Sequence, residues 1–460
     1  MKQKKLEGLG QRIFEQRYSY PGEKDYADRC YSIAKHVASA EKEEEKEKWF
    51  DRFYEALNTG DFIPGGRIIY GSGRNRQNLL NCYAIEPEDS VESIGKTIQD
   101  MYRISCGGGG IGFNFSKIRP KGDDIGNVKN SSPGAVSVMK MINEVGNHVK
   151  AGKNRRTALM AELNVEHPDL LEFLHVKLDL NSLSNFNISV AINDDFIKAC
   201  EKDKEWTFKF GNKEYYVFSV DRVSPDGTTK KIQIVALSEE DAASRGSNHY
   251  LWHPDDKFLN IERVEYKAID LWNRLWDNAV ESGDPGIFNL SLTNKHTNMS
   301  YFLKMNQTNP CGEIPLESYA NCCLGHINLA NMLTEDESDI DWKRLAKTIR
   351  AGIRFLDDVL TVNHYPLPEC KTAGERSRRV GLGTLGLHHM LIRLGIKYGS
   401  EKCLEFLDRL YATIRDEAYL TSMYIAREKG AFPEFNSDKY LDEEFARTLP
   451  ARIRMLFKQN

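Results

Sequence analysis

Apolar side chains recur at helical spacing toward both ends of the chain. Residues 41–57 form a charged run that becomes amphipathic, and with the segments before it they predict a helical N-terminal region over residues 1–60. In the C-terminal half, one apolar stripe covers residues 342–360 and another covers residues 404–426. Both stripes repeat at the spacing of one helix face, so each predicts a long amphipathic helix.

Shorter apolar runs between these ends predict strands. Residues 62–70 hold a glycine turn and an apolar run, and residues 79–85 hold a second run; both are typical of buried strands. From residue 206 to residue 235 apolar and polar residues alternate around a Pro-Asp-Gly turn, which predicts hairpins in a peripheral insertion over residues 205–265. Because strands and helices are interleaved, the pattern favours the α/β class.

A further helix is predicted to begin at Asp89. Glu92 follows three residues later, which is the capping-box pattern, and Val91 and Ile94 begin an apolar stripe along one face. The glycines at 107–110 then allow close backbone packing before another strand. Their spacing matches neither a Walker motif nor a dinucleotide-binding fingerprint, so they do not predict a phosphate site.

Composition narrows the classes of function. A formal net charge of -4 with 28% charged residues gives no overall basic field, which argues against a nucleic-acid partner. No apolar run approaches the roughly 18 residues that span a bilayer, and the N-terminus lacks an apolar leader, so we expect a cytoplasmic protein without a membrane partner. The nine cysteines are irregularly spaced, and in a reducing compartment any disulfide would be catalytic.

The segment Asn309-Pro310-Cys311-Gly312-Glu313 carries candidate chemistry. In an extended loop, residues two apart point the same way, so an amide, a thiol and a carboxylate can face one ligand. A thiyl radical can exchange a hydrogen atom with an activated sugar carbon while a carboxylate accepts a hydroxyl proton. An isolated Cys-x-Glu is more often a buried thiol beside a surface acid. No Cys-x-x-Cys pair completes a four-ligand set, so no metal site is predicted.

Several sequence segments, arranged along the chain in the order of one protein family, decide between a catalytic Cys-x-Glu and an ordinary buried thiol beside a surface acid. They include FIPGGRIIYGSG, GGGGIGFNFSKIRPKG, RRTALMAELNVEHPDLLEF, NFNISVAI, NPCGEIPL, CCLGHINLANM and RRVGLGTLGL. With them the chain resembles the catalytic, or large, subunit of ribonucleotide reductase, and is most similar to the adenosylcobalamin-dependent class. The resemblance implies an α/β fold over residues 61–460: a ten-stranded α/β barrel of two parallel half-barrels, with a central finger loop.

The resemblance also assigns catalytic roles. It implies that Cys311 is the transient thiyl that removes the 3' hydrogen of the ribose, that Glu313 is the base on the 3' hydroxyl, and that Asn309 binds hydroxyls. Cys82 and Cys322 are expected to be the pair oxidised to a disulfide when the 2' hydroxyl leaves as water. The barrel must therefore bring their Cα atoms to roughly 4.4–6.8 Å.

Substrate binding is expected at Asn81, Gly66 and Gly312. Asn81 stands where the family often has serine. The product would be a 2'-deoxyribonucleotide made from a ribonucleoside di- or triphosphate.

Regulation by a deoxynucleotide or ATP effector is a further implication. Asp89 and Ser90 match the contact to the effector ribose, and Arg119 with Lys121 falls in the loop that holds its phosphates. The loop expected to relay effector identity carries Lys153, Arg155 and Arg156. In the family the helix after Asp89 pairs across a homodimer, so its apolar stripe is either interface or core.

The family implies that a radical must come from outside the protein side chains. Adenosylcobalamin is the favoured source, and a separate dimetal subunit is the alternative; an external thiol of the thioredoxin or glutaredoxin type would restore the thiols. Relatives continue past the point where this chain stops, so we expect it to lack closing barrel strands and to need a second, C-terminal polypeptide. Two alternatives stay open: a truncated, non-catalytic nucleotide-binding relative, and a glycyl-radical enzyme.

Overall fold

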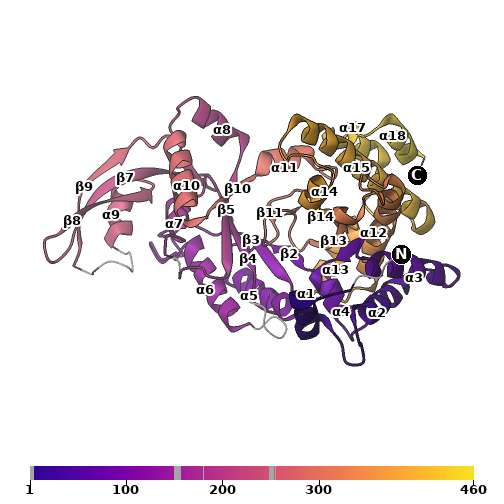
Figure 1. Cartoon of the computed structure of the whole chain (residues 1–460). Helices are drawn as coiled ribbons and strands as arrows, with labels where there is room; N and C mark the ends of the chain where they lie inside the picture. Colours follow the sequence, from indigo (N-terminus) through magenta and orange to yellow (C-terminus); the bar gives the residue numbers. More distant parts are fainter. Residues whose placement is uncertain (1–4, 150–156, 180, 248–252, 254, 460) are drawn as a thin grey trace.

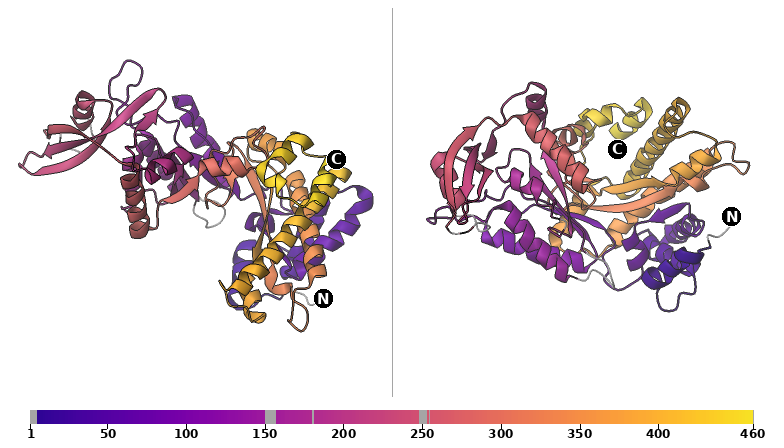
Figure 2. Two further views of the ribbon diagram at one scale, coloured as in Figure 1. Left: turned by 90° about the horizontal axis from the view of Figure 1, so that it is seen from above. Right: turned by 60° about the vertical axis from the view of Figure 1, so that its left-hand side comes forward.

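An eight-stranded sheet forms the centre of the molecule (Figure 1). The computed structural model describes residues 5–149, 157–179, 181–247, 253 and 255–459. A smaller four-stranded sheet lies at one end of the molecule, and a group of long helices lies at the other end (Figures 1 and 2). The central sheet therefore connects two peripheral regions, one built of strands and the other of helices.

One half of the central sheet is wholly parallel. β2 (Cys82–Ile85), β3 (Gly110–Asn114), β4 (Leu159–Asn164), β5 (Phe186–Ile192) and β10 (Gly286–Asn289) pair in that order, each parallel to the next. Nearly all residues of β2 to β5 are buried, which explains why these segments are continuous apolar runs rather than alternating ones.

In the other half of the sheet, β13 and β14 run in the direction opposite to β2, and only the short β1 runs the same way as β2. β13 (Asn321–Asn328) pairs antiparallel with β2 and with β1 (Phe62–Pro64), and parallel with β14 (Val380–Leu385). This is the expected reductase-type arrangement of two opposed parallel halves. Eight strands of the sheet are present in the described residues rather than ten, and three of them, β1, β10 and β14, have a single neighbour.

Long helices cover the β13 and β14 side of the sheet. α12 (Trp342–Val362) packs against both strands and is itself covered by α2 (Tyr26–Ala38), α3 (Lys46–Asn58) and α15 (Glu401–Lys429). α12 and α15 confirm the two amphipathic stripes found in the sequence. In Figure 2 the N-terminal helices and α15 lie on different sides of the strands.

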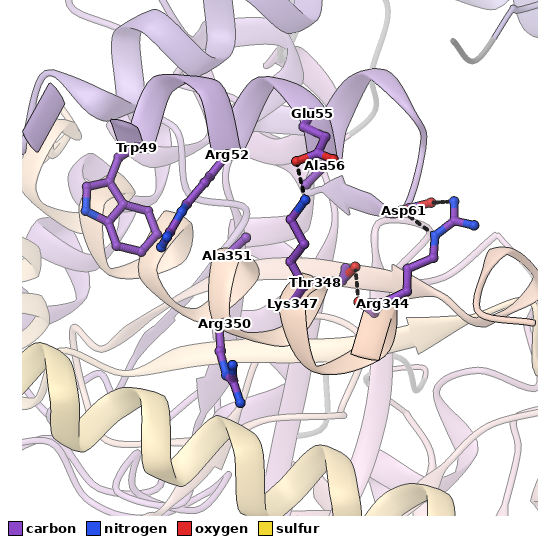
Figure 3. A pocket seen from close by; sticks show the side chains of 10 residues that line it. All are labelled: Trp49, Arg52, Glu55, Ala56, Asp61, Arg344, Lys347, Thr348, Arg350 and Ala351. Carbon is purple, nitrogen blue, oxygen red and sulfur yellow. Dashed lines mark hydrogen bonds and ion pairs between the residues drawn. The ribbon is translucent and has the colours of Figure 1, made fainter. Parts of the chain in front are cut away.

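The contact between α3 and α12 combines an aromatic core with an ionic rim. Phe355 of α12 meets Phe53 and Phe62 edge to face, with ring centroids 5.2 and 5.3 Å apart. At the rim, a cavity of about 280 Å³ is bordered by Arg344, which donates to Asp61 at 2.7 and 2.8 Å (Figure 3). The N-terminal helices are thereby joined to the sheet by both kinds of contact.

Residues 208–264, within the expected insertion, form a separate small sheet, which confirms the predicted hairpins. β6 (Phe208–Phe210), β7 (Lys213–Val223) and β8 (Thr229–Ala236) are antiparallel, and β9 (Lys257–Val264) pairs with the other edge of β7. α9 (Glu239–Ser247) packs on β8 and β9. The insertion projects from the end of the molecule opposite α12 (Figure 1).

The remaining helices surround these sheets. They are α1 (Gly8–Ile13), α4 (Gly66–Gly71), α5 (Val91–Cys106), α6 (Ala135–His148), α7 (Leu170–His175), α8 (Asp194–Glu201), α10 (Ala268–Ser282), α11 (Leu290–His296), α13 (Pro368–Ser377), α14 (Leu387–Arg393), α16 (Ser437–Asp442), α17 (Glu444–Arg447) and α18 (Ala451–Lys458). Within the part of the chain that the structure describes, none of the helices has the length and apolar character to cross a membrane.

Two local predictions are wrong. Residues 66–71 form the helix α4, and only Phe62–Pro64 is a strand, because pairing with β13 ends where the amide of Gly65 donates to Leu324. At α5 the N-cap is Ser90, whose hydroxyl accepts from the amide of Ser93 at 3.1 Å. Asp89 does not cap the helix because its carboxylate binds Arg119 instead.

Candidate active site

The segment around Cys311 forms a finger loop. β11 (Gln307–Thr308) and β12 (Pro315–Leu316) pair antiparallel and carry residues 309–314 as the tip. Asn309 closes the tip: its amide donates to the Ile314 carbonyl at 3.2 Å, and its side-chain oxygen accepts from the Ile314 amide at 3.0 Å. Gly312 has a φ of 80°, a left-handed conformation that glycine adopts without strain.

The glycine run of β3 makes room for this finger. A Cβ at Gly112 would overlap the carbonyl oxygen of Thr308, and a Cβ at Gly110 would lie 2.7 Å from Cγ of Pro310. In Figure 1 β11 lies between β3 and the β13–β14 pair, and β11 contacts β3. The predicted role of the glycines in close backbone packing is therefore confirmed, with the finger as the segment that they admit.

Polar side chains of β3, β4 and β5 hold the base of the finger; those of Asn114 and Glu162 are buried, and that of Asn187 is exposed. Asn114 donates to the carbonyl of Asn306, Asn187 donates to the carbonyl of Pro310 at 3.0 Å, and Glu162 accepts from Thr308. None of the three holding residues was predicted from the sequence. The available signal was a polar residue inside each apolar strand, which predicts a hydrogen-bond partner where the residue is buried, as at Asn114 and Glu162, but does not identify that partner.

Cys82 and Cys322 face each other across the sheet. They are directly paired residues of β2 and β13, which run antiparallel at this point. Paired residues in such ladders have Cα atoms about 4.5–5.5 Å apart, which lies inside the roughly 4.4–6.8 Å range of disulfides. The structure thus brings together two cysteines that are remote in sequence. All nine cysteines lie in the described residues, and none is in a disulfide.

Both members of the pair are buried thiols. Burial raises the pKa of Cys82 to about 12; the amide of Asn309, which donates to its sulfur at 3.3 Å, opposes the shift, and the nearby Glu313 adds to it. Burial likewise raises the pKa of Cys322 to about 12, with Arg379 opposing and Glu313 adding. At neutral pH both sulfurs therefore carry their protons.

The finger tip is open at its end and closed where it leaves β11. Cys311, Gly312 and Glu313 are exposed, whereas Asn309 and Pro310 are buried. Cys311 is therefore exposed, unlike the buried thiol that is expected for an isolated Cys-x-Glu pattern. It is near enough to Cys82 to affect its pKa electrostatically, as Glu313 is. One amide, one carboxylate and three thiols thus share a single site.

The residues expected to bind substrate lie next to the cysteine pair. Asn81 directly precedes Cys82, and its side-chain oxygen accepts from the amide of Arg67 at 3.2 Å. Gly66 begins α4 one residue earlier, and Gly312 lies at the finger tip. Asn81 therefore orients the start of α4.

The residues expected to bind effector form two groups. Arg119 donates to Asp89 through its side chain at 2.7 Å and through its amide at 3.3 Å, beside Ser90. Lys121 points elsewhere: its ammonium binds Glu172 at 3.0 Å beside a cavity of about 770 Å³ that β8 also lines. The remaining three lie outside the described residues: Lys153, Arg155 and Arg156.

The apolar stripe of α5 is only partly covered. Val91 is 83% exposed, Ile94 and Ile98 are half-buried, and Met101 is buried. The described residues contain no cluster of three or more His, Cys, Asp or Glu side chains that could hold a metal.

Comparisons with known proteins agree with this arrangement. The family model for the ribonucleotide reductase barrel domain matches residues 80–452, and the model for the all-alpha domain of the same enzyme matches residues 4–77. The division of the chain at residue 60 and the separate insertion stay predictions.

The curated relatives carry reductase names. The vitamin B12-dependent ribonucleoside-diphosphate reductase of Thermoplasma acidophilum is 34% identical over 396 residues, covering 86% of this chain and 45% of the relative. A protein of the same name from Mycobacterium tuberculosis is 33% identical over 432 residues, covering 93% and 54%. The ribonucleoside-diphosphate reductase subunit alpha of Chlamydia pneumoniae is 28% identical over 452 residues, covering 93% and 41%. The chain spans about half the length of these relatives.

Family models cover most of the chain, and the sheet order, the finger loop and the paired cysteines form one consistent site. The chain therefore belongs to the ribonucleotide reductase family, as a large-subunit member.

Proposed function

We propose that this chain carries the catalytic site that reduces ribonucleoside di- or triphosphates to 2'-deoxyribonucleotides. The observation that supports it most directly is the pairing of Cys82 with Cys322 beneath a finger whose Asn309 donates to Cys82. A pure nucleotide-binding module has no use for two opposed thiols below an exposed third one. That separates the proposal from a regulatory, non-catalytic relative.

The chemistry divides among the side chains of the site. As a thiyl, Cys311 takes the hydrogen atom from C3' of the ribose and becomes a thiol, while Glu313 accepts the proton of the 3' hydroxyl. The 2' hydroxyl leaves as water. Cys82 and Cys322 supply two electrons and two protons and become a disulfide, and Cys311 returns its hydrogen atom to C3'. Asn309 binds the hydroxyls, and Asn81, Gly66 and Gly312 border the sugar.

Adenosylcobalamin is the proposed source of the radical. Two of the most similar relatives are named vitamin B12-dependent, and the exposed finger tip leaves Cys311 accessible to a group bound above it. When bound, the cofactor supplies an organic radical through cleavage of its cobalt–carbon bond. The alternative source is a separate dimetal subunit. It is supported by the likeness to a protein named subunit alpha.

Regulation by a deoxynucleotide or ATP is proposed at the loop that follows β3. Arg119 and Asp89 form one ion pair there that is about one-third exposed, so phosphate and ribose groups can reach both side chains. The exposed Val91 on α5 supports a homodimer through that helix. Both roles are inferred from the family resemblance and from these exposures.

The sheet edges at β10 and β14 support a second polypeptide as a partner. β10 and β14 each have one neighbour among the described strands, and unpaired strand edges are templates for further pairing. We propose that further strands, from the same gene product or from another chain, complete the barrel. A thioredoxin- or glutaredoxin-type reductant is proposed to restore the thiols. We propose that the protein works in the cytoplasm, where reductants of this type keep thiols reduced.

Turnover by single-cysteine variants tests the proposed function. The chain, isolated with any polypeptide that co-purifies, is incubated with each ribonucleotide, dithiothreitol and adenosylcobalamin or a metal-loaded partner subunit. Cys311→Ser is expected to abolish deoxynucleotide formation. Cys106→Ser is the matched control, because Cys106 is also exposed but lies at the end of α5. Turnover that persists without Cys311 refutes the assignment; nucleotide binding without turnover by the unaltered protein favours the regulatory alternative.

A further inference from the structure

Glu162 is a fully buried acid beneath the finger loop. It lies on β4, between Asn114 of β3 and Ser189 of β5, and its side chain is 0% exposed. One carboxyl oxygen, Oε1, accepts from the amide of Thr308 at 2.9 Å and from its hydroxyl at 2.6 Å. The other oxygen, Oε2, is buried and has no hydrogen-bond partner among the described residues.

The surroundings of Glu162 contain no charge to balance an ionised carboxylate. The neighbouring strands β3, β5 and β11 carry no titratable residue, and the titratable groups of the finger, Cys311 and Glu313, lie at its exposed tip. Helix α7, which also packs on β4, carries Glu172 and His175, whose partners are Lys121 and the carbonyl of Leu171. Burial raises the pKa of Glu162 to about 8, and the two bonds from Thr308 oppose this shift only in part. At neutral pH the group is therefore a neutral acid, and its unpartnered Oε2 carries no charge.

Burying a carboxyl group that has no charged partner costs free energy, which an apolar side chain in the same strand would not. Valine would fill the space without the cost, so the acid is explained only by what its one engaged oxygen does. That oxygen accepts from both donor groups of Thr308, its amide and its hydroxyl. Thr308 immediately precedes Asn309, the residue that closes the finger tip and contacts Cys82.

We propose that Glu162 is a positioning residue: its uncharged carboxyl group anchors Thr308 and thereby aligns Asn309 and Cys311 over the cysteine pair. The inference deepens the proposed function and rests on it for the catalytic consequence, but the anchoring itself is a property of the folded chain. Above the pKa of Glu162, ionisation places a charge at the sealed Oε2. Water must then enter beneath the finger, and its base loosens.

Three variants separate anchoring from mere filling of space. Glu162→Gln keeps an oxygen acceptor and stays neutral at every pH; Glu162→Val keeps the approximate volume and removes the acceptor. Thr308→Val removes only the hydroxyl donor and keeps the amide, so it tests the same bond from the opposite side if Glu162→Val fails to fold.

Hydrogen–deuterium exchange of residues 303–316 reads the anchoring without any need for turnover. We expect exchange of this segment to quicken about tenfold in Glu162→Val, to quicken less in Thr308→Val, and to change little in Glu162→Gln. Above about pH 8, the unaltered chain should exchange faster than Glu162→Gln, whereas below it the two should match. Taking the ratio of the two proteins at one pH cancels the intrinsic pH dependence of exchange.

Kinetics supply the second readout. With an active reductase, Glu162→Val should lower kcat by about 100-fold through misplacement of Cys311 while KM for the nucleotide stays nearly constant. Unchanged exchange in both Glu162→Val and Thr308→Val overturns the proposal, as does a Glu162→Gln variant as damaged as Glu162→Val. If no reductase activity exists at all, the exchange result still decides the anchoring, and only the proposed function fails.

Discussion

Asn309 is the residue through which the finger meets the cysteine pair. Its carboxamide accepts from Ile314 and donates to Cys82, so one side chain both shapes the tip and contacts a thiol that we propose to be redox-active. The same residue is expected to bind substrate hydroxyls, and a bound sugar would compete for that donor. Substrate binding would then release the sulfur of Cys82 from its one hydrogen bond. The chemistry of Asn309 therefore depends on residues that are far from it in the sequence, such as Cys82.

Thiol reactivity gives the first prediction. At about pH 8, iodoacetamide should modify Cys311 well before Cys82 and Cys322, because the thiolate is the nucleophile and the pKa of both buried thiols is about 12. Cys106, which is also exposed, serves as the internal reference. Peptide mass spectrometry of timed samples follows each site. Modification of Cys82 as fast as Cys311 would show that the pair is not sealed.

At the scale of elements, the finger and the strand beneath it form one unit. Glycines in β3 remove the side chains that the finger would otherwise meet, and acids and amides in β3, β4 and β5 hold its base. On the other side of the sheet, the long helix α12 is likewise held by a buried polar contact. There Glu41 accepts from Arg354 at 2.7 Å in a bidentate pair that is almost fully buried.

Gly112→Ala tests the seat of the finger. The added Cβ overlaps the main chain of Thr308, so the finger must lift, and we expect reductase activity to fall at least about 100-fold while the fold survives. Gly10→Ala in α1 is the control, because nothing lies within 4 Å of a Cβ there. Deoxynucleotide formation and circular dichroism report the two effects. Full activity in Gly112→Ala would place the finger elsewhere.

Arg354→Met tests the buried ion pair on α12. Removing Arg354 takes away the bidentate partner of the buried Glu41 and leaves it the ion pair with Lys429 at 2.8 Å, so the free energy of unfolding should fall by about 2–3 kcal/mol. Arg350→Met, one turn earlier on the same helix, removes a mostly exposed arginine that pairs with Glu417, and should cost at most about 1 kcal/mol. Urea denaturation compares the two variants. Equal losses would contradict the difference in burial.

For the whole molecule, the sequence predicted most of the architecture and part of the site. Helical stripes as long as that of α12 are unambiguous, and the finger and its cysteines follow from the family resemblance. The helix α4 was missed because the apolar triplet Ile68-Ile69-Tyr70 is equally typical of a strand. The true cap of α5 was missed because Arg119, thirty positions away, takes the carboxylate of Asp89.

Glu162 shows more clearly why part of the structure could not be predicted from the sequence. Its place in an apolar run predicts burial, but its partner is Thr308, 146 positions away, and only the seated finger brings them together. Local patterns predict which residues are inside; they do not predict which long-range polar pairs form. The open edges at β10 and β14 are likewise a property of the assembled sheet.

The most direct test of the account is a single turnover without external reductant. Fully reduced protein, isolated with any polypeptide that co-purifies and supplied with its radical source and a ribonucleotide, should form about one deoxynucleotide per active site from its own thiols. Peptide mapping should then find one new disulfide, between Cys82 and Cys322. Deoxynucleotide formed while both of these cysteines remain thiols would contradict the central claim.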